Sequence, residues 1–112
     1  MEIAEREDGG VAILDLSGRL ILSDGEKPFR QKIDDLMKRG QTRILLNFQD
    51  VTYLDSAGVG AVVWKFVSLK RQGGQLKLLN LSARSHKVLS VTKLLTVLDT
   101  FDSEAAALKS FR

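Results

Sequence analysis

An eight-residue segment, Tyr53-Leu54-Asp55-Ser56-Ala57-Gly58-Val59-Gly60, joins a mostly apolar run to a segment with helical spacing. The preceding run, residues 44–48, is typical of a strand that is buried on both faces. The following run, residues 56–72, has a broad apolar arc at helical spacing and ends at a Gly-Gly pair. Because a strand that leads directly into a helix returns to its sheet by a crossover, this segment favours an α/β fold.

The rest of the chain continues the alternation after an N-terminal hairpin. Residues 2–8 and 11–17 are extended runs on either side of Gly9-Gly10, which indicates a tight antiparallel turn. A loop over residues 18–25 precedes an amphipathic helix with Pro28 near its start and Gly40 at its end. The remaining patterns predict a strand at 75–81, a short helix at 85–91, a strand at 95–99 and a helix at 103–110.

These elements predict one domain over residues 1–112. We expect a mixed, mostly parallel sheet with an antiparallel N-terminal hairpin, flanked by about four helices. Of its 112 residues, 44% are hydrophobic and 28% are charged, as in a soluble globular protein. The apolar runs are too short to cross a bilayer, and the acidic N-terminal residues do not fit an export signal. The absence of cysteine is compatible with a reducing compartment. We therefore expect a cytoplasmic protein without membrane insertion.

Charge is distributed unevenly along the chain. The net charge is only +3, yet no Asp or Glu occurs between Ser56 and Leu98. The same stretch carries seven basic residues: Lys65, Lys70, Arg71, Lys77, Arg84, Lys87 and Lys93. This asymmetry indicates either an anionic partner or an ordinary solvated basic surface. Nucleic-acid binding would require all of these cations to lie on one face. We expect no direct nucleic-acid partner.

Ser56 occupies a position that suits an anion. A phosphate on this serine would meet free backbone N–H groups and the positive end of a helix dipole. Asp55 and Ser56 are both favoured N-cap residues, and a cap alone would explain them. It would not explain Gly58 and Gly60, each of which costs a helix about 1 kcal/mol relative to alanine. Close approach of another backbone or of a phosphate would account for both glycines.

Two catalytic interpretations of the turn fail on detail. A dinucleotide cradle lacks its third glycine, because Val63 stands there, and lacks the acid expected about 20 residues later. A hydrolase elbow needs glycine two residues before the serine, where this chain has Leu54, and the only histidine is His86. No Walker lysine and no metal-ligand spacing are present. The sequence thus predicts neither catalysis nor a cofactor or metal.

The segment from Asp55 to Gly60 resembles the Asp-Ser-x-Gly-Leu/Val-Gly signature of STAS domains, in particular bacterial anti-sigma-factor antagonists. The resemblance extends over nearly the whole chain. It includes Gly18-Arg19-Leu20, Asp50 behind the apolar strand, the Gly73-Gly74 break and the final helix at Ser103-Glu104.

The resemblance implies a binding protein controlled by phosphorylation. An unmodified antagonist of this kind binds an anti-sigma factor that is also a serine kinase, which releases the sigma factor. Phosphorylation reverses the binding, and a phosphoserine phosphatase restores it. Carried over to this chain, Ser56 is the phosphoacceptor and the molecule is a monomer or weak dimer. The implied partner-binding residues are Asp55, Ala57, Gly58, Val59, Gly60, Leu20, Ile21 and Asp24.

The chain departs from the family pattern at one position. STAS antagonists often have an acid directly after the Gly-x-Leu segment, whereas here Ile21 follows and Asp24 is the nearest acid. STAS domains also act as scaffolds in signalling assemblies and as regulatory subunits of membrane transporters. A role of that kind, not controlled by phosphorylation, is the alternative prediction.

Overall fold

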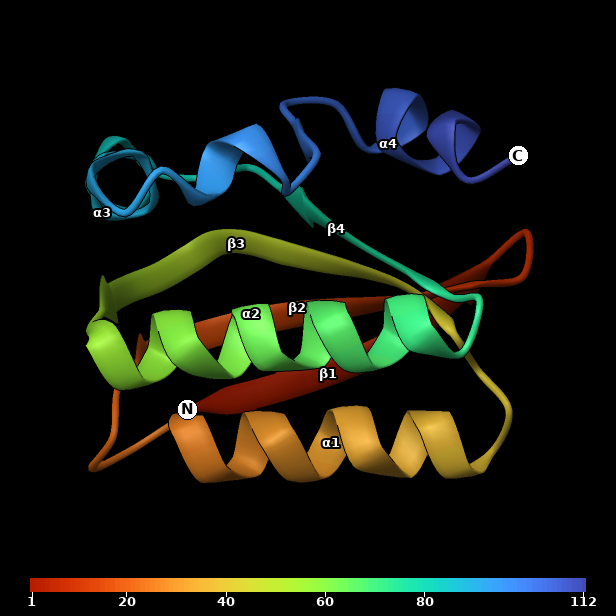
Figure 1. Ribbon diagram of the computed structural model, residues 1–112, viewed down its shortest axis with the longest axis horizontal. Coiled ribbons are helices and arrows are strands. Elements are labelled where there is room, and N and C mark those ends of the chain that lie inside the picture. Colours follow the sequence, from red (N-terminus) through yellow and green to blue (C-terminus); the bar gives the residue numbers. More distant parts are fainter.

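The computed structural model describes residues 1–112 and contains a five-stranded sheet and four α-helices (Figure 1). The order along the chain is β1 (Glu2–Asp8), β2 (Val11–Leu20), α1 (Glu26–Lys38), β3 (Arg43–Leu54), α2 (Ser56–Arg71), β4 (Gln75–Leu79), α3 (Ala83–Val91), a 3₁₀ turn η1 (Leu94–Thr96), β5 (Thr100–Phe101) and α4 (Glu104–Ser110).

The strands lie in the order β1-β2-β3-β4-β5. Strands β1 and β2 are antiparallel, and each later neighbour pairs in parallel. Gly9 and Gly10 form the hairpin turn with φ of 58° and 83°, a backbone region that glycine enters without steric cost. The predicted α/β class, the N-terminal hairpin and the mostly parallel sheet are therefore confirmed.

The two faces of the sheet are covered unequally. Alternate residues of the central strands, such as Leu14 and Leu46, enter the larger core beneath α1 and α2, which lie side by side in Figure 1. Their neighbours Ile13 and Leu45 point to the other face, where Ala107 and Phe111 from the C-terminal end of the chain cover them. Strand β3 is thus buried on both faces, as its apolar run predicts.

The part of the second face that α4 leaves open carries a polar ladder. Arg6 Nε donates to Asp15 Oδ2 at 2.7 Å, Asn47 Nδ2 donates to Asp15 Oδ1 at 2.9 Å, and Asn80 Nδ2 donates to Asn47 Oδ1 at 3.2 Å. Arg6 also donates to Glu104 at the start of α4. Cross-strand pairs of this kind make an exposed sheet face compatible with water and connect α4 to β1.

Helix α2 has two apolar neighbours, which accounts for its broad apolar arc. One side packs on β3 and β4, and another packs on α1. Between the two helices, Lys65 Nζ lies 2.6 Å from Asp34 Oδ1, and the Lys65 side chain is only 9% exposed. The lysine stem fills the interface while its ammonium reaches the exposed carboxylate at the rim.

The predicted strand at 95–99 is wrong. Residues 94–96 form η1, and β5 comprises only Thr100 and Phe101. Leu94, Leu95 and Leu98 turn toward the main core, a spacing that fits a helical turn instead of alternating strand positions. Smaller differences concern element ends, because β2 and β3 continue to Leu20 and Leu54. No helix is both long enough and apolar enough to span a bilayer.

Candidate functional site

The turn from β3 into α2 is fixed by Asp55. Its backbone is extended, with φ −103° and ψ −177°, and its Oδ1 accepts the Gly58 N–H at 2.8 Å. This is the N-cap arrangement that the sequence favours. Ser56 is therefore the first helical residue, and it is exposed. In Figure 1 this turn lies at the same end of the sheet as the loop that joins β2 to α1.

The second oxygen of Asp55 holds that neighbouring loop. Asp55 Oδ2 accepts the Leu22 N–H at 3.1 Å, so one carboxylate joins two segments that are 33 residues apart. The hydrogen bond from the Gly58 N–H, followed by that from Leu22, keeps the pKa of Asp55 below its usual range. Asp55 thus joins the β2–α1 loop to the start of α2, a structural role beyond that of an N-cap.

Gly58 and Gly60 have different reasons to be glycine. A Cβ on Gly58 would collide with the Leu20 carbonyl oxygen and would also lie 3.0 Å from Leu54 Cδ1. Gly58 therefore lets the end of β2 approach the start of α2, which is the close backbone approach considered from the sequence. A Cβ on Gly60 would meet nothing within 4 Å, because Gly60 faces solvent. Only Gly60 leaves its space open to another molecule.

Large apolar side chains are exposed on the loop bound to Asp55, at the end of β3 and along α2. Leu22 is 70% exposed, Tyr53 is 54% exposed and Trp64 is 62% exposed. Ser56, Gly60 and Trp64 follow each other at four-residue intervals along one exposed face of α2. We call Leu22, Tyr53, Ser56, Gly60 and Trp64 the Ser56 surface. A cluster of this kind on a water-exposed surface is typical of a protein-docking site.

Sequence reasoning assigned no partner-binding role to Leu22, Tyr53 or Trp64. Tyr53 alternates with the buried Leu54 at the end of β3, which is a signal for exposure once the strand is extended that far. The guanidinium carbon of Arg84 lies 4.6 Å from the centre of the Tyr53 ring, so the start of α3 adjoins this surface.

The other predicted partner-binding residues divide by burial. Leu20 is fully buried: its side chain packs in the core, and its carbonyl lies against Gly58. Its role in partner binding stays a prediction. Val59 is 7% exposed and also belongs to the core. Ile21 and Ala57 are half-buried beside Ser56.

Asp24, the acid nearest to Ile21, is engaged within the chain. Its Oδ1 lies 2.8 Å from the Met1 amino group, and its Oδ2 accepts from Arg19 Nε at 3.2 Å. The hydrogen bond from the Met1 amino group, followed by that from Arg19, keeps the pKa of Asp24 below its usual range. The loop from Ile21 to Gly25 therefore presents apolar side chains and no free carboxylate.

Two of the seven basic residues are buried instead of lying free at the surface. Lys65 is buried against Asp34, and Lys77 is buried with Nζ 2.9 Å from the Ser110 carbonyl oxygen and 3.8 Å from Asp99. Both cations serve packing between elements. His86, the single histidine, is exposed on α3, and no group of three or more His, Cys, Asp or Glu side chains is arranged to hold a metal ion.

The fold and this turn define an α/β domain that presents a serine at a helix N-terminus within an exposed apolar surface. The chain belongs to the STAS domain family, whose model matches residues 2–107. The resemblance drawn from the Asp55–Gly60 signature is thereby confirmed.

Three known proteins are similar to this chain over most or much of its length. The anti-sigma F factor antagonist of Paenibacillus polymyxa is 25% identical over 109 residues, which cover 96% of this chain and 92% of that protein. The anti-sigma-B factor antagonist of Bacillus subtilis is 42% identical over 71 residues, 62% of this chain and 63% of that one. The structure of the Bacillus cell fate determinant SpoIIAA in its phosphorylated form superposes with a TM-score of 0.76 at 26% identity, covering 99% and 100% of the two chains.

Proposed function

We propose that this chain is an anti-sigma-factor antagonist whose unphosphorylated form binds an anti-sigma factor that is also a serine kinase, and so releases a sigma factor. The observation that carries the proposal is the exposed Ser56 at the first position of α2, inside a surface of exposed apolar side chains. The family membership and the named antagonist relatives support it.

The Ser56 surface has the composition of a binding site. Aromatic side chains and arginine contribute most to protein interfaces. Here Tyr53 and Trp64 are exposed on the two elements that meet at the Ser56 turn, and Arg84 lies against Tyr53. Gly60 carries no side chain on the exposed face of α2 between Ser56 and Trp64, which leaves open space there for a partner side chain. Asp55 contributes by holding the turn and the Leu22 loop in one arrangement.

Phosphorylation would oppose this contact electrostatically. A phosphoserine brings a charge of about −1.5 to −2 and three acceptor oxygens to an otherwise apolar contact. A hundredfold loss of affinity requires only about 2.7 kcal/mol. Burying an unpaired dianion next to the Asp55 carboxylate can cost that much, even though the helix N-terminus returns around 1 kcal/mol in the free protein. A large conformational change is unnecessary.

The proposal is tested by incubating the chain with Mg-ATP and serine kinases from its cell of origin, followed by intact-mass analysis and site mapping. We expect one phosphate on Ser56 and removal of it by a phosphoserine phosphatase. Ser56→Ala should block phosphorylation and retain binding, whereas Ser56→Asp should weaken binding at least tenfold. Ser90→Asp, the same change at an exposed serine of α3, is the matched control and should leave binding unchanged. No phosphate on Ser56 together with full binding by Ser56→Asp would refute the switch.

A scaffold or transporter-subunit role without phosphorylation is the second candidate. The pairing of Asp24 with the Met1 amino group and Arg19 favours it, because the loop beside Ser56 then offers no free acid for a kinase to contact. In that case partner binding should depend on Trp64 and Leu22 but not on the charge at position 56. Binding measurements with Trp64→Ala and Ser56→Asp on the same partner separate the two candidates.

A further inference from the structure

Helix α3 carries cations that no carboxylate of the chain neutralises. Arg84 and Lys87 are exposed on α3, and every ion pair of the chain is formed by other residues. The helix contains no acid, although acids are the side chains that suit the first turn of a helix. Arg84 lies in that first turn, where the positive end of the helix dipole repels it. The charge of α3 therefore does not serve the stability of the helix.

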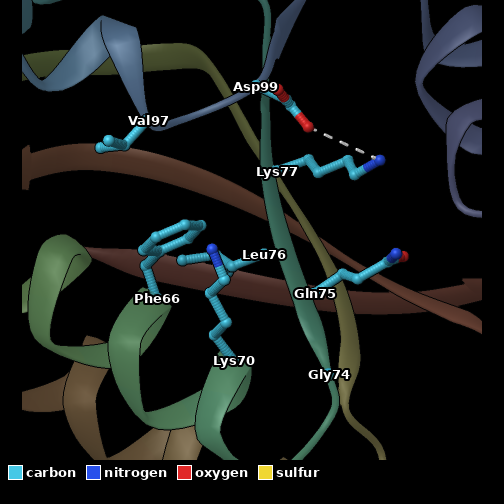
Figure 2. A pocket seen from close by; sticks show the side chains of 8 residues that line it. All are labelled: Phe66, Lys70, Gly74, Gln75, Leu76, Lys77, Val97 and Asp99. Carbon is cyan, nitrogen blue, oxygen red and sulfur yellow. Dashed lines mark ion pairs between the residues drawn. The ribbon is translucent and has the colours of Figure 1, made fainter.

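The cations near the last turn of α2 have different surroundings. Figure 2 shows Lys70 beside Phe66 at a cavity of about 290 Å³, with the Lys70 Nζ 5.7 Å from the centre of the Phe66 ring. Asp99 lines the same cavity, and its carboxylate lies 3.8 Å from the Lys77 Nζ. A carboxylate thus accompanies the basic residues at this cavity, whereas α3 has none within ion-pair distance of its two cations.

One exposed face of α3 combines the two cations with an apolar side chain. Arg84, Lys87 and Val91 follow each other at intervals of three and four residues, which places them on the same face of the helix. Val91 is 75% exposed, more than either Leu22 or Trp64. We call Arg84, Lys87 and Val91 the α3 surface. Arginine together with apolar contact area is a combination that protein interfaces favour.

The α3 surface adjoins the Ser56 surface. The guanidinium carbon of Arg84 lies 4.6 Å from the ring centre of Tyr53, which belongs to the Ser56 surface. In Figure 1, α3 lies at the same end of the sheet as the turn from β3 into α2. A protein that covers Tyr53 is therefore brought next to Arg84. It meets unpaired positive charge there, which a carboxylate complements and a second cation does not.

We propose that the α3 surface is a docking site for an acidic segment of the partner protein that covers the Ser56 surface. Carboxylates of this segment would pair with Arg84 and Lys87, and an apolar residue of the segment would pack on Val91. Complementary charge of this kind speeds association and disfavours basic competitors. The inference rests on the proposed function in naming the partner, but recognition of an acidic segment is measurable without that partner.

The test begins with a phage-displayed library of random linear dodecapeptides selected on the immobilised full chain. We expect enriched peptides to be acidic and to carry at least one large apolar residue. The double substitution Arg84→Glu/Lys87→Glu should weaken their binding at least tenfold, and Val91→Ser should weaken it several-fold. Raising the salt concentration should weaken the binding of wild type much more than that of the double variant, because screening acts on the charge pairs.

Lys70→Glu/Arg71→Glu is the matched control. It makes the same change in net charge at two exposed cations in the last turn of α2, and it should leave peptide binding unchanged. Urea unfolding separates lost binding from lost folding. Arg84→Glu places an acid in the first turn of α3, so this single variant should have a urea midpoint at or above that of wild type while binding the peptides less tightly.

Enrichment without an acidic pattern, or equal loss of binding in the two double variants, would overturn the proposal. Binding of a random-sequence DNA duplex at physiological salt, tighter than that of the peptides and removed by Arg84→Glu/Lys87→Glu, would assign the surface to nucleic acid and would also overturn it. The proposed function is tested separately. Acidic peptides that bind α3 of a chain whose Ser56 no kinase modifies would support this inference and refute the phosphorylation switch, and a phosphate on Ser56 without any acidic peptide would do the reverse.

Discussion

Gly58→Ala and Gly60→Ala should change the free energy of unfolding in opposite directions, although both substitutions lie in the first turns of α2. At position 60 the new methyl group meets nothing within 4 Å. Only helix propensity then changes, and alanine is preferred over glycine by about 1 kcal/mol. We expect Gly60→Ala to stabilise the chain by about 0.5–1 kcal/mol and to raise Tm by about 4 °C.

At position 58 the same methyl group would occupy the space of the Leu20 carbonyl oxygen, with Leu54 Cδ1 at 3.0 Å on its other side. Relief requires the start of α2 or the end of β2 to move, which disturbs the Asp55 cap. Loss of the cap costs about 1 kcal/mol, and overpacking costs about 1–3 kcal/mol. The propensity gain offsets about 1 kcal/mol of this sum. Gly58→Ala should therefore destabilise by about 1–3 kcal/mol.

The measurement is urea unfolding of both variants and the wild type, followed by circular dichroism. An unchanged m-value for each variant would show that the midpoints report stability. Gly58→Ala with wild-type stability, or Gly60→Ala with a loss above 1 kcal/mol, would refute the assignment of the two glycines. Gly60→Ala should also weaken partner binding, because its methyl group takes up open space on the exposed face of α2 between Ser56 and Trp64.

Three further predictions concern single side chains. Asp55→Asn should destabilise the chain most above about pH 5. The pKa of Asp55 is lower in the folded than in the unfolded chain, so its carboxylate stabilises the fold above the unfolded pKa, and this stabilisation is lost as the pH falls through the folded pKa. A difference in Tm that does not change with pH would contradict this. Asp34→Asn should destabilise the chain more than Lys65→Met, because Asp34→Asn leaves the buried Lys65 ammonium without a carboxylate. Equal urea midpoints for the two variants would contradict this. Trp64, the single tryptophan, should emit at the long wavelength of an exposed indole and shift to the blue when a partner binds; an unshifted spectrum in a verified complex would remove it from the interface.

Much of the fold follows from local patterns in the sequence. The Gly9-Gly10 turn, the apolar run at residues 44–48 and the Gly73-Gly74 break each determine structure through backbone preference or side-chain spacing within a few residues. The final strand was not predictable in this way. Leu94, Leu95 and Leu98 are attracted to the core, and strand pairing begins only where Asp99 meets Leu78, twenty-one residues away. Such short strands depend on non-local pairing.

The candidate site, like the fold, was predictable from the sequence only in part. The serine, its cap and the cost of the two glycines are visible in the sequence, because N-cap and helix propensities act locally. The exposure of Leu22 and Tyr53 was not visible, since it depends on how the β2–α1 loop and the end of β3 are placed beside each other. The burial of Leu20 and Lys65 depends on the same kind of packing.

The sequence by itself determined the alternation of strands and helices, the family signature and the position of Ser56 at a helix N-terminus. Only the tertiary structure decided that Gly58 accommodates the Leu20 carbonyl while Gly60 faces solvent. The physical reason is that propensities and spacing are properties of neighbouring residues. Steric contact and burial arise between segments that are distant in the chain, so they exist only once the chain is folded.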